Sequence, residues 1–333
     1  MLRRLLLPLL LVAACTKHPV DPDEGGVDAG DEEPATTTSA VKIFVEPSDN
    51  AQALVTSLQN AQSSIHMTMY LLTNNTVIST LVAKKKAGLE VKVVLNQTFP
   101  AGSGSDNSSV FNQLQSGGVE VVWAPSVFTY THEKAVVIDG TSAWIMTMNV
   151  TFSSPTANRE YLALDTDPDD IAETEQIFQA DFANTGATFT GKLLVAPVNA
   201  HQGLLDLIND AQTKLDVEDE ELSDAQIVTA LVAAHDRGVA VRVVLSDDTP
   251  TTAMSNAVTT LEADGIGVKK LSDPYVHAKA IVADDVLCYV GSENMTANSL
   301  DSNRELGLII SAVSEIAKVD ATIVADFGAG VVY

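Results

Sequence analysis

The hydrophobic pattern of the chain changes repeatedly between two periods. From residue 41 onward, apolar residues spaced three or four apart alternate with short continuous apolar runs. The first helical stretch places Leu54, Val55, Leu58 and Ala61 on one face, and the second places Val77, Ile78, Leu81 and Val82 inward. Strands are predicted over Ile65–Tyr70 and over Val91–Leu95, the latter apolar enough to be covered on both faces. This alternation predicts an α/β sandwich with mixed, largely parallel sheets flanked by helices.

The same pattern occurs a second time. Residues 43–96 align without a gap with residues 193–246, at an offset of 150, and the copies align again beyond residue 130 at an offset of 145. The sequence therefore predicts two tandem repeats, over 41–190 and 191–333, that form a pseudo-twofold dimer within one chain. We expect a monomer, since the second copy is already present.

Each repeat carries a polar constellation in its second half, and the spacing is identical in the two. The first set is His132, Lys134, Asp139, Asn149, Thr151, Asn158, Arg159 and Glu160. The second set is His277, Lys279, Asp284, Asn294, Thr296, Asn303, Arg304 and Glu305. A single H-x-K-x4-D pattern recurs by chance, but two copies with further polar matches indicate a functional site.

Local structure predicts which of these residues meet. His132 and Lys134 are two apart on a strand and share a face. Asp139 precedes Gly140 and an apolar run, which is typical of a hairpin turn far from the histidine. The return strand brings Asn149 back to the level of His132. Asp284 and Asn294 repeat this arrangement.

These motifs resemble the HKD motif of the phospholipase D superfamily, H-x-K-x4-D-x6-G-S-x-N, which occurs twice in bilobal members. The second repeat fits in full. The first departs at Met146 and Thr147, where the family has Gly and Ser. Met146 brings a side chain to a crowded position, so the sequence does not determine the geometry of the first half-site.

The resemblance implies a mechanism without a metal or another cofactor. One neutral histidine attacks phosphorus to form a phosphohistidine, and the other donates a proton to the leaving oxygen. By analogy with the family, His132 is the expected nucleophile and His277 the expected acid. The sequence itself does not distinguish them.

The resemblance also assigns supporting roles. Lys134, Lys279, Asn149 and Asn294 would surround the non-bridging oxygens of the phosphate. Glu160 and Glu305 would orient the histidines, Thr147 and Ser292 would support phosphate binding, and Asp139 and Asp284 would be structural.

Several functions fit these residues. We expect hydrolysis of the distal phosphodiester of a glycerophospholipid, giving phosphatidate and a free head group. A nuclease or other phosphodiesterase, a phosphatidyltransferase of the cardiolipin synthase kind and a non-enzymatic phosphate-ester binding protein are the alternatives. A net charge of −25 argues against a stable nucleic-acid partner. A cationic pocket made by Lys134, Arg159, Lys279 and Arg304 could still admit a single strand.

The N-terminus predicts export. Arg3 and Arg4 precede an apolar run too short to span a bilayer, which is typical of a signal peptide over 1–14. The ending Val12–Cys15 resembles a bacterial lipobox, so we expect lipidation of Cys15 and anchoring to a membrane, with Thr16 favouring the outer one. Residues 15–40 carry seven acidic side chains against one lysine, which is typical of a disordered linker.

The remaining polar residues have plainer expected roles. His66, His201 and His235 lack a histidine in the other repeat, so we interpret them as structural. Cys288 lies in an apolar run, which predicts a buried, inert thiol. The acidic cluster Glu218–Glu221 could line the cleft or be solvated, and we expect it to be solvated. Pro100–Ser109, flexible by composition, is expected to shape substrate entry.

Overall fold

The structure is a computed structural model that describes residues 40–186, 188–189 and 191–333. The predicted signal peptide, Cys15 and the acidic linker up to residue 39 lie outside the described residues. Among the described residues, no helix is both long and apolar enough to cross a membrane.

The described residues of the first repeat form seven strands and five helices. They are β1 (Val41–Glu46), α1 (Gln52–Asn60), β2 (Ser64–Met69), α2 (Asn75–Lys86), β3 (Glu90–Leu95), α3 (Ser108–Ser116), β4 (Glu120–Trp123), β5 (Lys134–Ile138), β6 (Ser142–Met146), α4 (Ser154–Ala157), β7 (Asn158–Asp165) and α5 (Pro168–Phe182). The predicted strands and helices are all present. Helix α3 begins at Ser108, so it includes the last two residues of Pro100–Ser109, the segment that the sequence predicted to be flexible.

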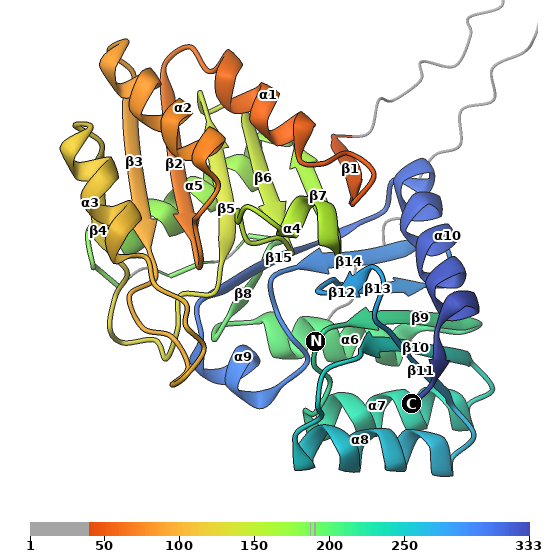
Figure 1. The fold of residues 1–333 in the computed structure, drawn as a ribbon. Helices are drawn as coiled ribbons and strands as arrows, with labels where there is room; N and C mark the ends of the chain where they lie inside the picture. The colour runs from red at the N-terminus through yellow and green to blue at the C-terminus, as the bar shows by residue number, and fades with distance from the viewer. Residues whose placement is uncertain (1–39, 187, 190) are drawn as a thin grey trace, which may run out of the picture. The chain divides into compact units, whose positions relative to one another are not determined.

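The second repeat follows the same order, with two additional short strands, β12 and β16 (Figure 1). Its elements are β8 (Leu194–Ala196), α6 (Ala200–Asp210), β9 (Lys214–Asp219), α7 (Ala225–Asp236), β10 (Ala240–Ser246), α8 (Thr252–Ala263), β11 (Gly267–Leu271), β12 (Tyr275–Val276), β13 (Lys279–Ala283), β14 (Leu287–Gly291), α9 (Ala297–Ser302), β15 (Glu305–Ile310), α10 (Val313–Ala329) and β16 (Val331–Val332). Equivalent helices begin alike: the side chains of Asn74 and Asp224 accept hydrogen bonds from the first N–H groups of α2 and α7.

Each repeat contributes one mixed sheet. The first has the order β1-β7-β6-β5-β2-β3-β4, with β12 added on β7, and the second β16-β11-β10-β9-β13-β14-β15-β8. The α/β sandwich is confirmed, but the prediction of largely parallel sheets was wrong. Parallel pairing joins only β2, β3 and β4, their counterparts β9, β10 and β11, and β12 with β7. The strands that follow each histidine are joined by tight hairpins, which can only produce antiparallel neighbours.

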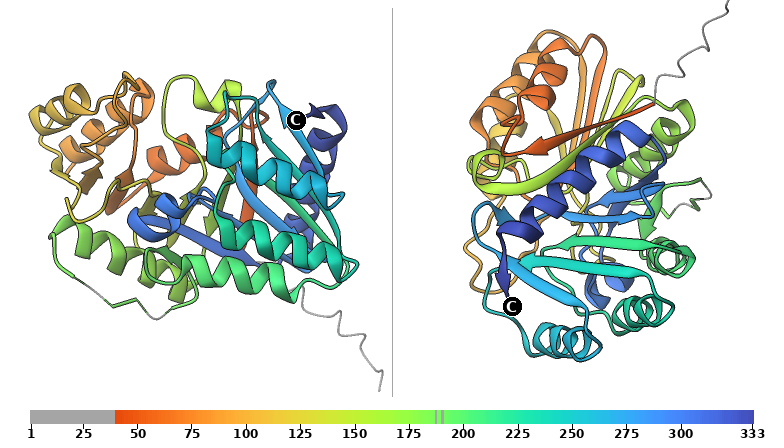
Figure 2. Two further views of the ribbon diagram at one scale, coloured as in Figure 1. Left: turned by 90° about the horizontal axis from the view of Figure 1, so that it is seen from below. Right: turned by 90° about the vertical axis from the view of Figure 1, so that its right-hand side faces the viewer.

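Helices cover both faces of each sheet (Figures 1 and 2). In β2, Ile65 and Met67 face the core beneath α1 and α2, whereas His66 faces α5, where its ring stacks on Phe178. His66 is also paired with Glu175, so it is a satisfied structural histidine as predicted. A third core draws on both repeats, with Ile145 and Tyr161 packed among residues of β13, β14 and β15. The described parts of the two repeats therefore share one interior.

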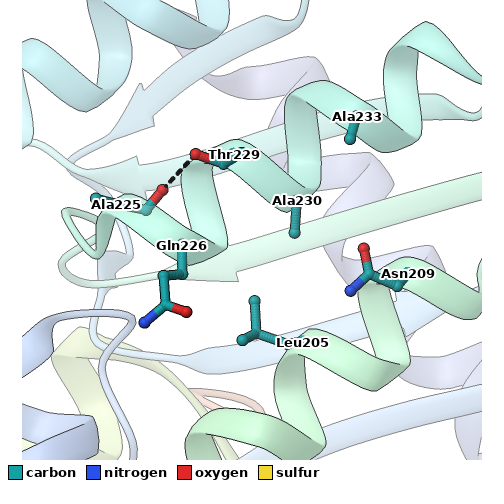
Figure 3. Close-up of a pocket in the computed structure, with 7 residues that line it drawn as sticks. All are labelled: Leu205, Asn209, Ala225, Gln226, Thr229, Ala230 and Ala233. Carbon is teal, nitrogen blue, oxygen red and sulfur yellow. Dashed lines mark hydrogen bonds between the residues drawn. The ribbon is translucent and has the colours of Figure 1, made fainter.

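The outer helices of the second repeat leave a surface hollow between α6 and α7 (Figure 3). Small and uncharged side chains line it, among them Ala225, Ala230 and Ala233. None of its lining residues is titratable, so it offers no acid–base chemistry. The histidines and lysines of the two motifs lie elsewhere in the described part of the chain, between the two repeats.

Candidate active site

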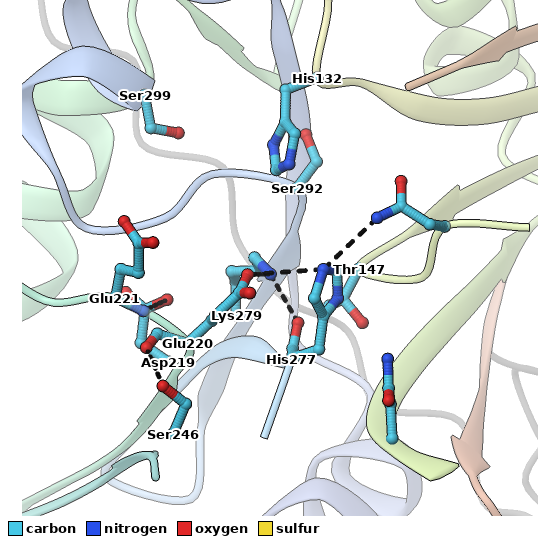
Figure 4. Close-up of polar contacts among 12 residues, drawn as sticks. His132, Thr147, Asp219, Glu220, Glu221, Ser246, His277, Lys279, Ser292 and Ser299 are labelled. Carbon is cyan, nitrogen blue, oxygen red and sulfur yellow. Dashed lines mark hydrogen bonds and ion pairs between the residues drawn. The ribbon is translucent and has the colours of Figure 1, made fainter. Parts of the chain in front are cut away.

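The segments that carry the two histidines cross from one repeat to the other. Thr131 forms a parallel bridge with Arg304, and the N–H of His132 donates to the Arg304 carbonyl at 2.8 Å. In the same way β12 pairs with β7, and the N–H of His277 donates to the Arg159 carbonyl at 3.3 Å. Each histidine therefore lies beside the Asn-Arg-Glu segment of the other repeat, and the two rings project into the same space (Figure 4).

This crossing pairs each histidine with a carboxylate of the other repeat. Nδ1 of His132 lies 2.9 Å from Glu305, and Nδ1 of His277 lies 2.9 Å from Glu160. Both carboxylates are fully buried. A carboxylate on Nδ1 fixes the tautomer and leaves Nε2 as the nitrogen that faces substrate. The sequence placed both glutamates at the histidines, but it did not show that the pairs exchange between repeats.

The two hydroxyl residues expected to support phosphate binding contact these carboxylates instead. Thr147 Oγ1 donates to Glu160 at 2.5 Å, and Ser292 Oγ donates to Glu305 at 2.7 Å. A buried carboxylate requires several hydrogen-bond donors. Each hydroxyl lies at the end of the strand next to that of its carboxylate, so it can supply one of them. Asn158 and Asn303 donate further hydrogen bonds to Glu160 and Glu305, respectively. The sequence showed that both repeats contain this asparagine but did not indicate its role.

Both motif lysines are buried beneath the histidines. Nζ of Lys134 donates to the His132 carbonyl at 2.5 Å, and Nζ of Lys279 donates to the His277 carbonyl at 2.6 Å. Burial lowers the pKa of Lys134 to about 7, with the charge of Lys279 adding to the effect. Burial, helped by both lysines and opposed by Glu305, also lowers the pKa of His132 to about 4. His132 is therefore neutral at pH 7, as a nucleophile must be.

The motif asparagines provide polar atoms without a protein partner. The Asn149 amide nitrogen lies 3.4 Å from Nε2 of His277, so Asn149 reaches the reactive nitrogen of the other repeat. Within the described part of the chain, Oδ1 of Asn149 and Oδ1 of Asn294 form no hydrogen bond, although both are shielded from solvent. Buried polar atoms are normally paired, so both amides are suited to contact a bound polar group.

The acidic cluster Glu218–Glu221 does not lie in solvent throughout, which corrects the sequence prediction. Glu218 accepts a hydrogen bond from Tyr161 at 2.6 Å, and Asp219 accepts one from the Met295 N–H at 2.7 Å. Glu220 lies 2.7 Å from Nζ of Lys279 and 3.4 Å from Nε2 of His277. The missed signal was the alignment at an offset of 150, which places residues 218–220 opposite the end of the strand predicted over Ile65–Tyr70. Glu218 and Asp219 are the last residues of β9, which lies between β10 and β13 in its sheet, so the burial of this strand reaches the cluster.

Glu220 is ionised in spite of its surroundings. Burial opposes ionisation, but the electrostatic effects of the adjacent His277 and Lys279 and the hydrogen bond from Lys279 hold the pKa of this carboxyl far below its usual value. Only Glu221 of the cluster is exposed. The site therefore contains a carboxylate, Glu220, within a run of acids whose composition is typical of a surface.

The two arginines do not form the cationic pocket considered above. Arg304 donates through Nε to Asp181 at 2.8 Å, and Arg159 donates through Nε to Asp326 at 2.5 Å. Both pairs are shielded from solvent. Their charge is thus neutralised within the fold, and the cationic groups that face the site are the two lysines.

The motif aspartates link the hairpin turns to the start of β2 and of β9. Asp139 and Asp284 both have positive φ, at 57° and 55°. The carboxylate of Asp139 accepts hydrogen bonds from the N–H groups of Gln62, Ser63 and Ser64, and Asp284 does the same in the second repeat. These hydrogen bonds lower the pKa of Asp284 to about 2 against the opposing effect of burial. Both aspartates lie far from the reactive nitrogens, at the other end of the hairpin.

Met146 fits because its surroundings differ from those of Gly291. A Cβ at Gly291 would approach the Cα of Gly307 to 2.6 Å and the Tyr289 hydroxyl to 2.5 Å. In the first repeat Leu162 replaces Gly307, and Met146 packs with it in the hydrophobic core. The departure from the family motif is therefore a local exchange of core residues, and it leaves the Thr147–Glu160 contact intact.

Comparison with known proteins agrees with this geometry. A family model described as "Cardiolipin synthase, PLD-like domain" matches residues 54–182 and again residues 204–326. The chain belongs to the phospholipase D superfamily. It has two domains of this phospholipase D-like type, each with one histidine of the site.

Individual relatives are distant. Cardiolipin synthase of Listeria monocytogenes is 23% identical over 337 residues, covering 87% of this chain and 69% of that protein. Cardiolipin synthase of Staphylococcus aureus is 22% identical over 321 residues, covering 83% and 64%. Among solved structures, phosphatidylserine synthase of Haemophilus influenzae superposes with a TM-score of 0.68 at 12% identity, covering 88% of this chain and 87% of that one. Polyphosphate kinase of Porphyromonas gingivalis gives 0.67 at 17% identity, covering 85% and 46%, and both likenesses concern the fold alone.

The family assignment sets the general chemistry. The protein is a phospholipase D-superfamily enzyme that acts on phosphodiester bonds. In the described residues no group of histidine, cysteine, aspartate or glutamate side chains is arranged to hold a metal ion. Cys288 is fully buried and burial raises the pKa of its thiol, in agreement with the prediction of an inert cysteine.

Proposed function

We propose that the protein is a phospholipase D-type phosphodiesterase that hydrolyses the distal phosphodiester of glycerophospholipids. The observation that carries the proposal is the convergence of two carboxylate-bound histidines and two buried lysines between the repeats. The lysines offset the charge of a phosphodiester, and each histidine keeps one nitrogen for chemistry. A single repeat would supply only half of this set.

The reaction follows from these groups. Nε2 of His132 attacks phosphorus, a P–N bond forms, and the P–O bond to the head group breaks. The departing oxygen takes the proton from Nε2 of His277, which becomes neutral. His277 then accepts a proton from water as the water oxygen attacks phosphorus and the P–N bond breaks. Phosphatidate leaves, and both histidines return to their starting states.

Phosphatidyl transfer is a second candidate, favoured by the relatives that are named cardiolipin synthases. The first step is the same, and the difference is the acceptor. If the hydroxyl of a second phospholipid replaces water, His277 removes its proton and the product is a new phosphodiester. The two candidates therefore share every residue of the site and differ in the molecule that reaches phosphorus in the second step.

The products distinguish them. Vesicles of phosphatidylglycerol would yield phosphatidate and glycerol by hydrolysis, but cardiolipin and glycerol by transfer. Vesicles of phosphatidylcholine, phosphatidylethanolamine and cardiolipin, together with single-stranded DNA and RNA, complete the panel. Cleavage confined to nucleic acid would contradict both lipid proposals. The His132→Asn variant is the control for contaminating activity.

We also propose that the protein is exported and held on a bacterial membrane by lipid on Cys15, which the sequence around Val12–Cys15 supports. Expression in a bacterial host with a labelled fatty acid tests this. The wild-type chain should take up label and sediment with membranes. The Cys15→Ser variant should do neither, and label in that variant would contradict the proposal.

A further inference from the structure

The two half-sites differ at one position next to the histidines. Glu220 of the second repeat corresponds to Tyr70 of the first at the offset of 150. The ring of Tyr70 meets His132 edge-on, with ring centroids 4.5 Å apart, and Nζ of Lys134 lies 5.2 Å from the centre of the Tyr70 ring. At the equivalent place, Glu220 contacts both Lys279 and His277 with a carboxylate (Figure 4). One histidine therefore has an uncharged neighbour where the other has an anion.

We propose that Glu220 is a positioning residue that gives the two otherwise equivalent histidines different roles. It holds the proton on Nε2 of His277, which makes His277 the acid of the first step and leaves His132 as the nucleophile. This inference rests on the proposed function and explains how a pseudo-symmetric site performs an asymmetric reaction.

The balance of charge around each ring supports the assignment. His277 faces Glu160, Glu220, Lys279 and the Asn149 amide. His132 faces Glu305, Lys134, Lys279 and the Tyr70 ring. An adjacent carboxylate favours an imidazolium and an adjacent ammonium disfavours it. In direct contact, His277 has two carboxylates, Glu160 and Glu220, whereas His132 has one, Glu305.

A hydrogen bond to the second carboxylate oxygen of Glu220, Oε1, helps to hold this side chain in place. Oε1 accepts a hydrogen bond from the Tyr275 hydroxyl at 3.0 Å, and that hydroxyl also contacts Asp248 at 2.6 Å. Tyr275 belongs to β12, the strand that leads directly to His277. The carboxylate is thus fixed relative to the histidine that it serves. When substrate binds, the ester oxygen takes the place of Oε2 at Nε2 and receives the proton as the P–O bond breaks and the bond to His132 forms.

The dependence on leaving group tests this role. An alkoxide leaving group needs a proton in the transition state, whereas p-nitrophenolate leaves without one. We would compare phosphatidylglycerol with phosphatidyl-p-nitrophenol in the same mixed micelles, for the wild-type enzyme and for Glu220→Gln. The variant should cleave phosphatidylglycerol about 100-fold more slowly than the wild type but lose less than about tenfold on the p-nitrophenyl ester. Glu221→Gln removes the same charge from the exposed neighbour and should leave the ratio of the two rates unchanged.

Each outcome has a separate meaning. The ratio compares two substrates with one preparation, so a loss of folded protein cancels. If Glu220→Gln slows both substrates equally, or slows neither, the inference is wrong while phosphodiester cleavage by the wild type still stands. If the wild type cleaves neither lipid, the proposed function itself fails.

Discussion

Nδ1 of His132 lies 2.9 Å from Oε2 of Glu305, although the two residues are 173 positions apart and belong to different repeats. The reciprocal pair joins His277 to Glu160. Neither repeat can therefore orient its own histidine, and the site exists only where the two repeats meet. The burial of both carboxylates means that these contacts also link the interiors of the repeats.

Replacing either carboxylate by an amide should disable the histidine of the other repeat that it contacts. We expect Glu305→Gln to lower kcat by about 10²-fold or more, since the amide no longer stabilises an oriented imidazole, and Glu160→Gln to act similarly through His277. Steady-state rates on phosphatidylglycerol measure the effect. Circular dichroism and thermal melting serve as the control for folding. A variant that keeps more than half of the wild-type rate would contradict the role of its carboxylate.

The pH dependence of kcat/KM should have two limbs. His132 must be neutral to attack, so activity is present above its pKa and is lost as the pH falls through about 4. Lys134 must be protonated to offset the phosphate charge, so activity is lost as the pH rises through about 7. Rates measured at subsaturating substrate from pH 3 to pH 9 would show both limbs, because kcat/KM reports the free enzyme.

Lys134→Arg is the matched variant for the basic limb. A guanidinium stays protonated over this range. On phosphatidyl-p-nitrophenol, whose leaving group needs no proton from His277, the fall in kcat/KM near pH 7 should therefore disappear in the variant even if its maximal rate is lower. An unchanged basic limb would show that another group controls it.

Arg304 should matter for stability rather than for substrate binding. Its guanidinium is paired with buried Asp181, so Arg304→Met leaves an uncompensated carboxylate and should cost about 3–5 kcal/mol of unfolding free energy. Urea denaturation measures this loss. The double variant Arg304→Met with Asp181→Leu should recover part of the stability, because it removes both buried charges. A change in KM without a change in stability would instead place Arg304 in the phosphate pocket.

The repeats, their order of strands and helices, and the polar residues of the motifs could be predicted from the sequence because each follows from local periodicity or internal alignment. The hairpin at Asp139 is of this kind. The sheet was predicted less well, since apolar runs do not show whether their neighbours are parallel. The buried C-terminal end of β9, and with it Glu220, was missed because four successive acids suggest a surface.

Other features depended on contacts between repeats. The alignment of the two copies placed Glu160 and Glu305 correctly, yet the exchange of partners arises from β12 crossing to β7, which no local pattern encodes. The partner of Arg304 is likewise distant in sequence, because Asp181 lies in the last turn of α5 in the first repeat. The residue types suggested a cationic pocket that includes Arg304, but the ion pair with Asp181 neutralises the charge of Arg304.

The central claim is that the two repeats form one active site with a covalent histidine intermediate, and trapping of that intermediate tests it most directly. His277→Asn, incubated with phosphatidyl-p-nitrophenol and quenched, should release up to one equivalent of p-nitrophenol and carry the phosphatidyl group on His132, as located by mass spectrometry. His132→Asn should carry none. Full turnover by His277→Asn, or an adduct on any residue other than His132, would contradict the account.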